Sequence, residues 1–313
     1  MSTNLFAAIL FLVSTFSFSQ TPKDGKIFLD STWNETTEAN HKYYRIIKDY
    51  YSDKESYKIY DYFKSGVLQM AGASKFKDRL QKEGPFVYYY ENGNKESMES
   101  YINGSQTGKQ YNWYQNGQKK SETEYFIDNN SRTPSYKIIQ FWDINGNQKI
   151  IDGIGEYEIK TDNFYETGKI VNGLKHGTWE GIVDSEKYSY TENYIEGNLI
   201  SGTSTDSNNI KYNYTSITTM PEPKKGIKHF YNFISNNFIK PSEAKLYKVS
   251  GTVYLTFIIE KDGRASDIKV VRKLGFGIDD EAIRVVKSYN QWSASKTRGM
   301  NRSVLYSLPI SIK

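Results

Sequence analysis

The sequence of 313 residues predicts a mainly β protein with a C-terminal α+β domain. Its first region is expected to be a single-layer array of antiparallel β-hairpin repeats, followed by a small ββαβ domain. Three observations support this division: a turn signal that recurs through residues 42–214, alternating apolar segments in the last sixty or so residues, and one helical period between those segments.

The C-terminal region begins with the pattern of a β-hairpin. Apolar side chains alternate along residues 251–260 and again along residues 265–271. Alternation of this kind places the apolar residues on one face of a strand. The segment 261–264 between them has the chemistry of a turn, because Gly263 is free to take a positive φ.

A helix and a third strand are expected after this hairpin. Three acidic residues at 279–281 precede apolar residues at helical spacing, and acidic side chains are favourable at a helix N-terminus. Residues 303–312 alternate once more and contain Pro309. Because proline cannot donate to a sheet ladder, we expect this last strand to lie at an edge of the sheet.

A boundary is predicted just before this region. Residues 215–225 contain Pro221 and Pro223 and are expected to be a linker that continues neither a sheet nor a helix. A helix should follow, leading into a domain at 226–313. The residues at helical spacing are Ile227, Phe230, Tyr231, Ile234 and Phe238.

Several short segments of this region carry a family resemblance. They are Ile239-Lys-Pro-Ser-Glu-Ala244, Gly251-Thr-Val-Tyr-Leu-Thr-Phe257, Lys261-Asp-Gly263, Ile278-Asp-Asp-Glu-Ala282, Val285-Val286, Trp292 and Tyr306-Ser-Leu-Pro-Ile310. Together they resemble the C-terminal domain of TonB-family energy transducers, in the form common in Bacteroidetes. The resemblance runs from about Pro221 to the C-terminus. It implies a periplasmic domain that binds the Ton box peptide of an outer-membrane receptor by adding it as a strand.

The last strand is therefore the predicted peptide-binding site. Backbone groups at the sheet edge would pair with the peptide, and Leu305 or Tyr306 would select its side chains. The same edge could pair with a second copy of the chain and form a homodimer. The predicted peptide-binding residues are Val304, Leu305, Tyr306, Ser307, Leu308, Ile310 and Ser311.

The C-terminal region is also the basic part of the chain. Residues 221–313 contain 17 Lys and Arg against 8 Asp and Glu. A nucleic acid would fit such a surface electrostatically, but export favours peptidoglycan, acidic lipid head groups or an acidic peptide flank, so no nucleic acid is expected. The predicted anion-facing residues are Arg264, Lys269, Arg272, Lys273, Arg284 and Lys287.

The preceding region repeats a short unit. It consists of two aromatic residues, a polar residue, asparagine or a similar small polar residue, and glycine. An Asn-Gly pair between alternating segments predicts a hairpin with a two-residue type I′ turn, which needs two positive φ angles. The units end at Gly66, Gly93, Gly117, Gly146 and Gly168, and secondary signals lie at 101–108, 171–179 and 194–202.

These units, across residues 42–214, resemble degenerate MORN repeats. Of the 27 tyrosines in the chain, 22 lie between Tyr43 and Tyr214. We expect these rings to stack between hairpins and build a thin core. The alternative is that exposed rows of rings bind glycan. The array is interpreted as a spacer or adaptor.

The N-terminus has the pattern of a targeting segment. Residues 5–18 are mostly apolar, and Ser17 and Ser19 suit cleavage before Gln20. We expect a signal peptide at 1–19, a polar segment at 20–41 and a periplasmic protein. An uncleaved inner-membrane anchor is the alternative, although the apolar stretch is short for a membrane span.

The sequence offers no chemistry typical of an enzyme. It contains no cysteine, and its three histidines, His41, His176 and His229, lie in different segments without metal-ligand spacing. His229 is expected at the surface, and no cofactor is expected. The first functional hypothesis is receptor-coupled transport through Ton box binding. The alternative is an envelope scaffold or peptidoglycan-binding adaptor that reuses the same fold.

Overall fold

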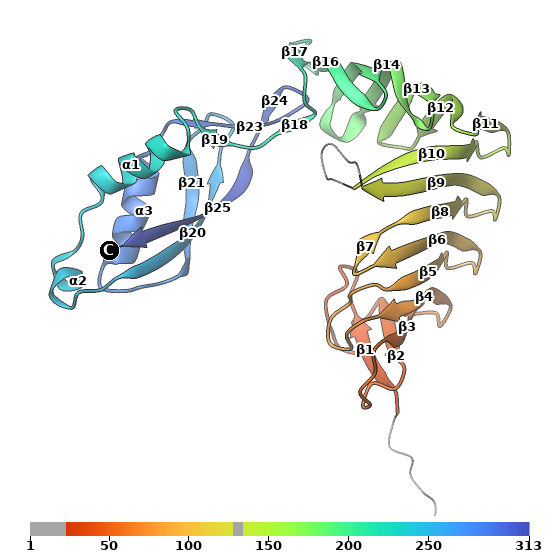
Figure 1. Ribbon diagram of the computed structural model, residues 1–313, viewed down its shortest axis with the longest axis horizontal. Helices are drawn as coiled ribbons and strands as arrows, with labels where there is room; N and C mark the ends of the chain where they lie inside the picture. The colour runs from red at the N-terminus through yellow and green to blue at the C-terminus, as the bar shows by residue number, and fades with distance from the viewer. Residues whose placement is uncertain (1–22, 128–133, 313) are drawn as a thin grey trace, which may run out of the picture. The chain divides into compact units, whose positions relative to one another are not determined.

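The computed structural model, drawn in Figure 1, describes residues 23–127 and 134–312. These residues fall into two compact units. Of the described residues, the first unit comprises 23–127, 134–136 and 144–147, and the second comprises 137–143 and 148–312. The predicted signal peptide at 1–19 lies outside the described residues. Of the helices in the part of the chain that is described, none is long and apolar enough to cross a bilayer.

The first unit is an antiparallel sheet in which strands pair with their neighbours along the chain. Both β7 and β8 pair with β6. Strand β1 lies within residues 20–41, where the sequence predicted only a polar segment. The strands are β1 (Gly25–Leu29), β2 (Tyr43–Ile47), β3 (Tyr57–Phe63), β4 (Leu68–Ser74), β5 (Gly84–Tyr89), β6 (Lys95–Ile102), β7 (Ser105–Gln106), β8 (Gly108–Trp113) and β9 (Lys119–Ile127).

The second unit begins with a further series of antiparallel strands, each paired with the next. A short 3-10 helix (Asp184–Glu186) joins two of them. The strands are β10 (Pro134–Trp142), β11 (Gln148–Ile151), β12 (Ile154–Lys160), β13 (Phe164–Val171), β14 (Leu174–Val183), β15 (Tyr188–Ile195), β16 (Asn198–Asp206) and β17 (Lys211–Tyr214).

Hairpins form as predicted, but the turn types differ from the expectation. At Gly66, Gly93, Gly117 and Gly146 only the glycine has a positive φ, so these loops are not type I′ turns. The pairs with two positive φ angles lie instead at the secondary signals and their equivalents: Asn103-Gly104, Asp152-Gly153, Asn172-Gly173 and Glu196-Gly197. Gly168 was predicted to end a turn but lies inside β13.

Gly168 is in β13 because a large ring occupies the space beside it. A Cβ at Gly168 would overlap the indole of Trp179 on the adjacent strand. The same arrangement recurs along the chain, so rings lie over strand glycines and cover the sheet, which confirms the expected core role for these aromatic residues. The pairs are Gly72 with Phe86, Gly168 with Trp179, Gly181 with Tyr190 and Gly202 with Tyr214.

The C-terminal domain has the predicted order of strand, strand, helix and strand. Its sheet has the order β21-β20-β25 and is antiparallel throughout. One face of this sheet and the helices enclose a core that includes Phe230, Phe257, Val285 and Trp292. The elements are α1 (Ile227–Asn237), α2 (Ser242–Leu246), β20 (Gly251–Ile259), β21 (Ala265–Arg272), α3 (Ile278–Ser288) and β25 (Val304–Ile312).

The predicted helix is present as α1, in which Phe230 and Ile234 are buried and Ile227 and Tyr231 are exposed. One expectation about the start of this domain needs correction. His229, expected at the surface, is half-buried, and its ring lies 6.3 Å from that of Tyr289.

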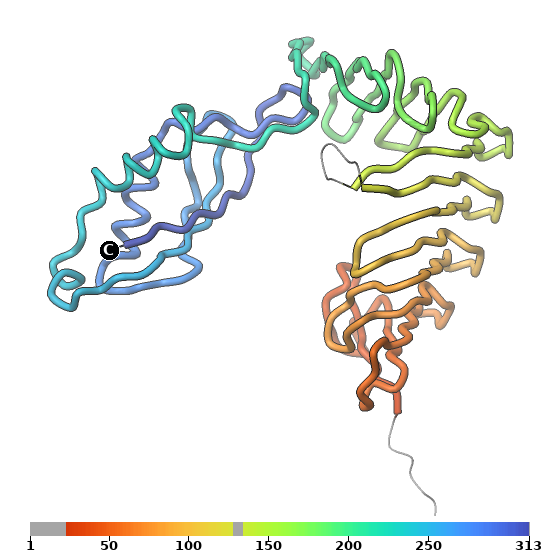
Figure 2. Tube along the Cα trace, in the orientation of Figure 1, coloured from red at the N-terminus to blue at the C-terminus, as the bar shows by residue number. Residues whose placement is uncertain are grey.

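The expectation that residues 215–225 continue neither a sheet nor a helix is wrong. This segment forms two very short strands, which pair with a segment between α3 and β25, and the two stretches run side by side in Figure 2. Pro223 is tolerated because the pairing is only two residues long. The paired elements are β18 (Thr218–Thr219) with β23 (Ser295–Thr297), and β19 (Glu222–Pro223) with β22 (Trp292–Ser293).

The packing of rings over glycines predicts a measurable cost for adding one methyl group. We expect Gly202→Ala to lower the free energy of unfolding by about 1–3 kcal/mol, because the new Cβ would overlap the ring of Tyr214. Urea unfolding followed by circular dichroism measures this. The matched control is Ser201→Ala at the exposed neighbouring position, for which a change below about 0.5 kcal/mol is expected. Equal effects of the two substitutions would contradict the packing argument.

Candidate functional site

The C-terminal sheet leaves its last strand unpaired along one side. Strand β25 pairs with β20 in an unbroken register from Val304–Ile259 to Ile312–Gly251. Among the residues that the structure describes, no other strand pairs with β25. Its nine residues carry no charged side chain. An edge of this kind presents free backbone N–H and C=O groups to an added strand, as the position of Pro309 predicted.

The opposite edge of the same sheet is less suited to strand addition. The pairing of β21 with β20 is interrupted by two register shifts, and Asp267 has a φ of +45°. Charged residues, including Asp267, Lys269 and Arg272, are exposed along β21. Bulges and charges are the devices by which proteins protect sheet edges. The regular edge of β25 is therefore the better docking surface.

A groove of about 470 Å³ lies against this free strand. Tyr231 and Ile234 of helix α1, with Phe238 directly after it, form one wall, and residues 309–312 of β25 form the other. Side chains of an added strand would alternate in direction, so every second one could enter the groove. The wall from α1 is a feature that sequence periodicity did not reveal.

The predicted peptide-binding residues divide between the two faces of the sheet. Leu305, Ser307 and Ser311 lie on the face away from the core, where Leu305 is 66% exposed. Leu308 and Ile310 are buried in the core. The Tyr306 ring is partly buried, with centroids 5.6 Å from Phe257 and 5.2 Å from Trp292, so it cannot turn outward to select a side chain without leaving the core.

The predicted anion-facing residues are not a single free cluster. Three of them have an acidic partner: Arg264 with Asp262, Lys269 with Asp267 and Arg284 with Glu281. Arg272 lies over the ring of Tyr254 on the open face of the sheet. Lys273 follows β21, and Lys287 lies near the end of α3. The anion-facing role of this set stays a prediction, with much of its charge neutralised locally.

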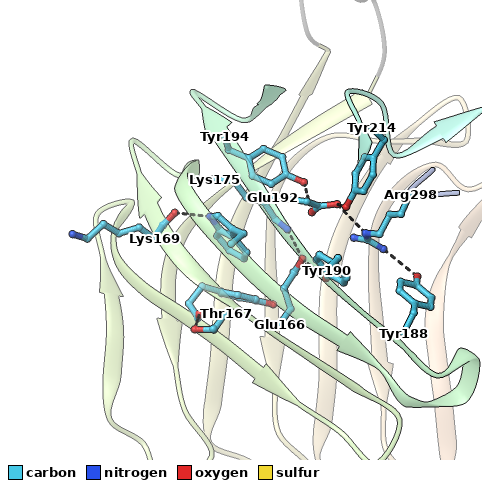
Figure 3. Close-up of polar contacts among 12 residues, drawn as sticks. Glu166, Thr167, Lys169, Lys175, Tyr188, Tyr190, Glu192, Tyr194, Tyr214 and Arg298 are labelled. Atoms are coloured by element: carbon cyan, nitrogen blue, oxygen red, sulfur yellow. Dashed lines mark hydrogen bonds and ion pairs between the residues drawn. The ribbon is translucent and has the colours of Figure 1, made fainter. Parts of the chain in front are cut away.

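A buried ion pair fixes the segment that leads into β25. The hairpin of β23 and β24 (Met300–Arg302) inserts the side chain of Arg298 against strand β15, as Figure 3 shows. Nε of Arg298 donates to Oε1 of Glu192 over 2.8 Å, and the Glu192 side chain is fully buried. The guanidinium also lies 3.7 Å from the ring centroid of Tyr190.

The carboxylate of Glu192 has further donors. The hydroxyl of Tyr214 donates to Oε1 over 2.7 Å, and that of Tyr194 donates to Oε2 over 2.8 Å. Burial alone would raise the pKa of Glu192, but hydrogen bonds from Arg298 and from these tyrosines hold it below its ordinary value. The carboxylate is therefore charged and fully satisfied, which is the condition under which a buried ion pair is tolerated.

The backbone of the same hairpin turn is also held. The amide of Arg298 donates to the carbonyl of Ile217 over 2.7 Å, and the hydroxyl of Ser204 donates to the carbonyl of Arg298 over 2.7 Å. Arg302 forms a second, more exposed ion pair with Glu186. Sequence reasoning missed this junction, because its partners are separated by about a hundred residues of chain and share no local motif.

The comparisons with known proteins concern the C-terminal domain. Residues 241–312 match the family described as the Gram-negative bacterial TonB protein C-terminal, and they form a TonB C-terminal domain. No curated protein sequence matches the chain. The domain match implies a TonB-like role in energy transduction and an interaction with TonB-dependent receptors. Domains of this family act in the periplasm, and the proteins that contain them are generally not enzymes.

No metal centre is visible in the described parts of the chain. Within residues 23–127 and 134–312, no group of three histidine, aspartate or glutamate side chains is arranged to hold a metal ion. The arrangement at β25 and α1 offers backbone hydrogen bonding and an apolar groove. Its chemistry is therefore that of binding.

The ion pair predicts unequal effects for two arginines of one hairpin. We expect Arg298→Ala to cost about 3 kcal/mol or more in stability, because it leaves the buried Glu192 without its cation. Arg302→Ala is the matched control and should cost no more than about 1 kcal/mol, since its ion pair is more exposed. Thermal and urea unfolding measure both. Similar losses for the two variants would contradict the assignment.

The lowered pKa of Glu192 predicts a pH dependence. A carboxyl whose pKa is lower in the folded state stabilises the fold above its ordinary value of 4.5, and this contribution is lost as pH falls further. The difference in melting temperature between the wild type and Glu192→Gln should be constant from about pH 7 to 5 and shrink at lower pH. A difference that grew on acidification would contradict this prediction.

Proposed function

We propose that this chain is an exported, periplasmic TonB-like protein whose C-terminal domain binds an extended peptide, the Ton box of an outer-membrane receptor, by adding it as a strand along β25. The observation that supports this most directly is the free, regular and uncharged edge of β25 beside the groove under α1. Main-chain hydrogen bonds would give affinity, and the groove would give side-chain selectivity.

The direction of the backbone groups on β25 follows from Pro309. Proline is accepted in an edge strand where its nitrogen faces away from the ladder. Backbone groups alternate in direction along a strand, so Leu305, Ser307 and Ser311 would face the added peptide, while Tyr306 and Leu308 would face β20. The peptide would thus meet three amide donors and a gap at Pro309.

The remaining parts of the chain are assigned supporting roles. We infer a signal peptide at 1–19, and a sheet region at 42–214 that serves as a spacer or adaptor. The resemblance of that region to MORN repeats stays a prediction. The scaffold alternative, in which the basic residues bind peptidoglycan, is weaker because Arg264, Lys269 and Arg284 have acidic partners.

Binding of receptor peptides to the mature full-length chain tests the proposal. The full chain is needed because residues 215–225 and Glu192 contact the segment that precedes β25. Peptides carrying the Ton box of receptors encoded by the same genome should bind when titrated by calorimetry. Absence of binding at millimolar peptide, to a chain shown to be folded, would contradict the proposal.

A pair of substitutions at one position separates backbone from side-chain recognition. We expect Ser307→Pro to weaken peptide binding at least tenfold, because it removes a central amide donor from the free edge. Ser307→Ala is the matched control and should retain affinity, because it keeps the amide. Melting temperatures of both variants should stay close to that of the wild type. Equal affinities of the two variants would exclude strand addition at this edge.

A further inference from the structure

The two units contain corresponding polar sites that a sequence repeat reveals. Lys82-Glu-Gly-Pro-Phe86 corresponds to Lys175-His-Gly-Thr-Trp179, and Glu99-Ser-Tyr-Ile-Asn-Gly104 corresponds, at the same spacing, to Glu192-Asn-Tyr-Ile-Glu-Gly197. In each unit the lysine precedes an inward-facing ring, and the glutamate lies on the adjoining strand. Glu99 is therefore the counterpart of Glu192, the carboxylate that holds Arg298.

The two carboxylates have one kind of donor in common. The tyrosine two residues further along donates to the carboxylate in both cases: Tyr101 to Glu99 and Tyr194 to Glu192. Gln110 Nε2 and Ser97 Oγ also donate to Glu99, over 3.3 and 3.1 Å.

The lysines correspond as well. The ammonium group of Lys82 lies 4.5 Å from the ring centroid of Tyr101, and that of Lys175 lies 5.2 Å from the ring centroid of Tyr194. Each lysine also lies over the ring four residues further along its own strand segment, at 5.3 Å for Phe86 and 4.0 Å for Trp179. The lysine therefore lies between the same two ring positions in both sites.

The two sites differ in the cations that contact their carboxylates. In the second unit, Glu166 and Glu192 are balanced by Lys175 and Arg298. In the first unit, Glu96 and Glu99 line a pocket with only Lys82, and among the described residues no lysine or arginine forms an ion pair with Glu99.

Two further cations, Lys120 and Arg45, act on the first site, and neither lines the pocket. Arg45 and Asp61, which face the same side of the sheet, are paired with each other over 2.7 Å. Burial and the charge of Glu99 raise the pKa of Glu96, against a smaller lowering by the charge of Lys120. Burial lowers the pKa of Lys82. Both shifts are in the direction that desolvation of a partly buried charged group produces.

The first site contains an open pocket, whereas tyrosine side chains fill the corresponding space in the second site. A pocket of about 480 Å³ lies around Glu99. It exists because Ser97 occupies the position that corresponds to Tyr190, and Thr123 the position that corresponds to Tyr214, which donates to Glu192.

An unsatisfied polar group lies beside this pocket. Thr123 is 9% exposed, and its Oγ1 has no hydrogen-bond partner. It pairs in register with Gln110, which lines the pocket, and it lies on the same strand face as Tyr125, another lining residue. A buried hydroxyl without a partner is uncommon and indicates a place for a further polar group.

We propose that the pocket around Glu99 binds the guanidinium group of an arginine that a partner protein presents on a tight turn, as the β23–β24 hairpin presents Arg298 to Glu192. The carboxylates of Glu99 and Glu96 supply the negative charge that pairs with this guanidinium. The rings of Tyr101 and Tyr125 supply flat surfaces on which a guanidinium can stack.

The chemistry favours arginine over other cations. A guanidinium is planar, remains charged and offers a fork of donors, so it can bind a carboxylate and neighbouring acceptors together. A lysine ammonium lacks the planar surface for stacking. The sheet region would then be an adaptor with its own partner, independent of the peptide bound at β25.

The test uses the full-length chain and a cyclic hairpin peptide that copies its own residues 295–302. The site at Glu192 is already occupied by Arg298, so binding in calorimetry should show one site per chain. Affinity should fall at least tenfold for Glu99→Gln and for a peptide with citrulline in place of Arg298, and a lysine peptide should bind more weakly than the arginine peptide. Glu124→Gln, at an exposed position on the opposite face of β9, is the control and should not change affinity.

Several results would overturn the proposal. They are equal binding of the citrulline and arginine peptides, unchanged affinity of Glu99→Gln, or no binding at millimolar peptide. If Glu99→Gln fails to fold, the comparison of arginine and citrulline peptides on the wild-type chain decides the question alone. Binding of a neutral oligosaccharide that competes with the peptide would assign the pocket to a hydroxyl-rich ligand and also contradict the proposal.

Discussion

The structure of the sheet regions depends on one constraint, which is that a one-layer sheet must cover its inner face with its own side chains. Rings of one strand lie over glycines of the next, as Trp179 lies over Gly168 and Tyr214 over Gly202. This explains the abundance of tyrosine and glycine in one stretch of the chain. It also explains why polar groups gather where a ring is missing, since nothing else is available to fill the space.

The same constraint shapes the junction with the C-terminal domain. Glu192 lies among inward-facing tyrosines and would be costly to bury without a cation, which Arg298 supplies from the β23–β24 hairpin. This hairpin ends at Arg302, and β25 begins at Val304. A mechanical force on a peptide paired with β25 would therefore be transmitted to the docked hairpin through a single intervening residue, Ser303. The docking contact and the proposed binding edge are adjacent in the chain.

Much of the C-terminal domain could be predicted from the sequence, because its signals are local. Alternating apolar residues predicted its strands, acidic residues marked the start of α3, and Pro309 indicated that the last strand lies at an edge of the sheet. The turn types could not be predicted in this way, because an Asn-Gly pair occurs both in two-residue turns and in longer loops. Gly168 was misplaced for a related reason: a glycine under a ring and a glycine in a turn look alike in the sequence.

The long-range contacts were beyond sequence reasoning. The pairing of Glu192 with Arg298 joins distant residues that have ordinary neighbours, and the short strand at Pro223 depends on a partner near Trp292. The groove beside β25 also needs the position of α1, which periodicity alone does not give. The strands were thus easier to predict than the surfaces that they form.

Amide hydrogen exchange of the full-length chain, with and without a receptor peptide, tests the central claim most directly. We expect slow exchange at Tyr306 and Leu308 in the free chain, because their amides face β20. We expect fast exchange at Leu305, Ser307 and Ser311, because their amides face the free edge. Addition of the peptide should slow exchange at these three positions. Protection of the three amides in the free chain, or no change on adding a peptide that binds, would contradict strand addition at β25.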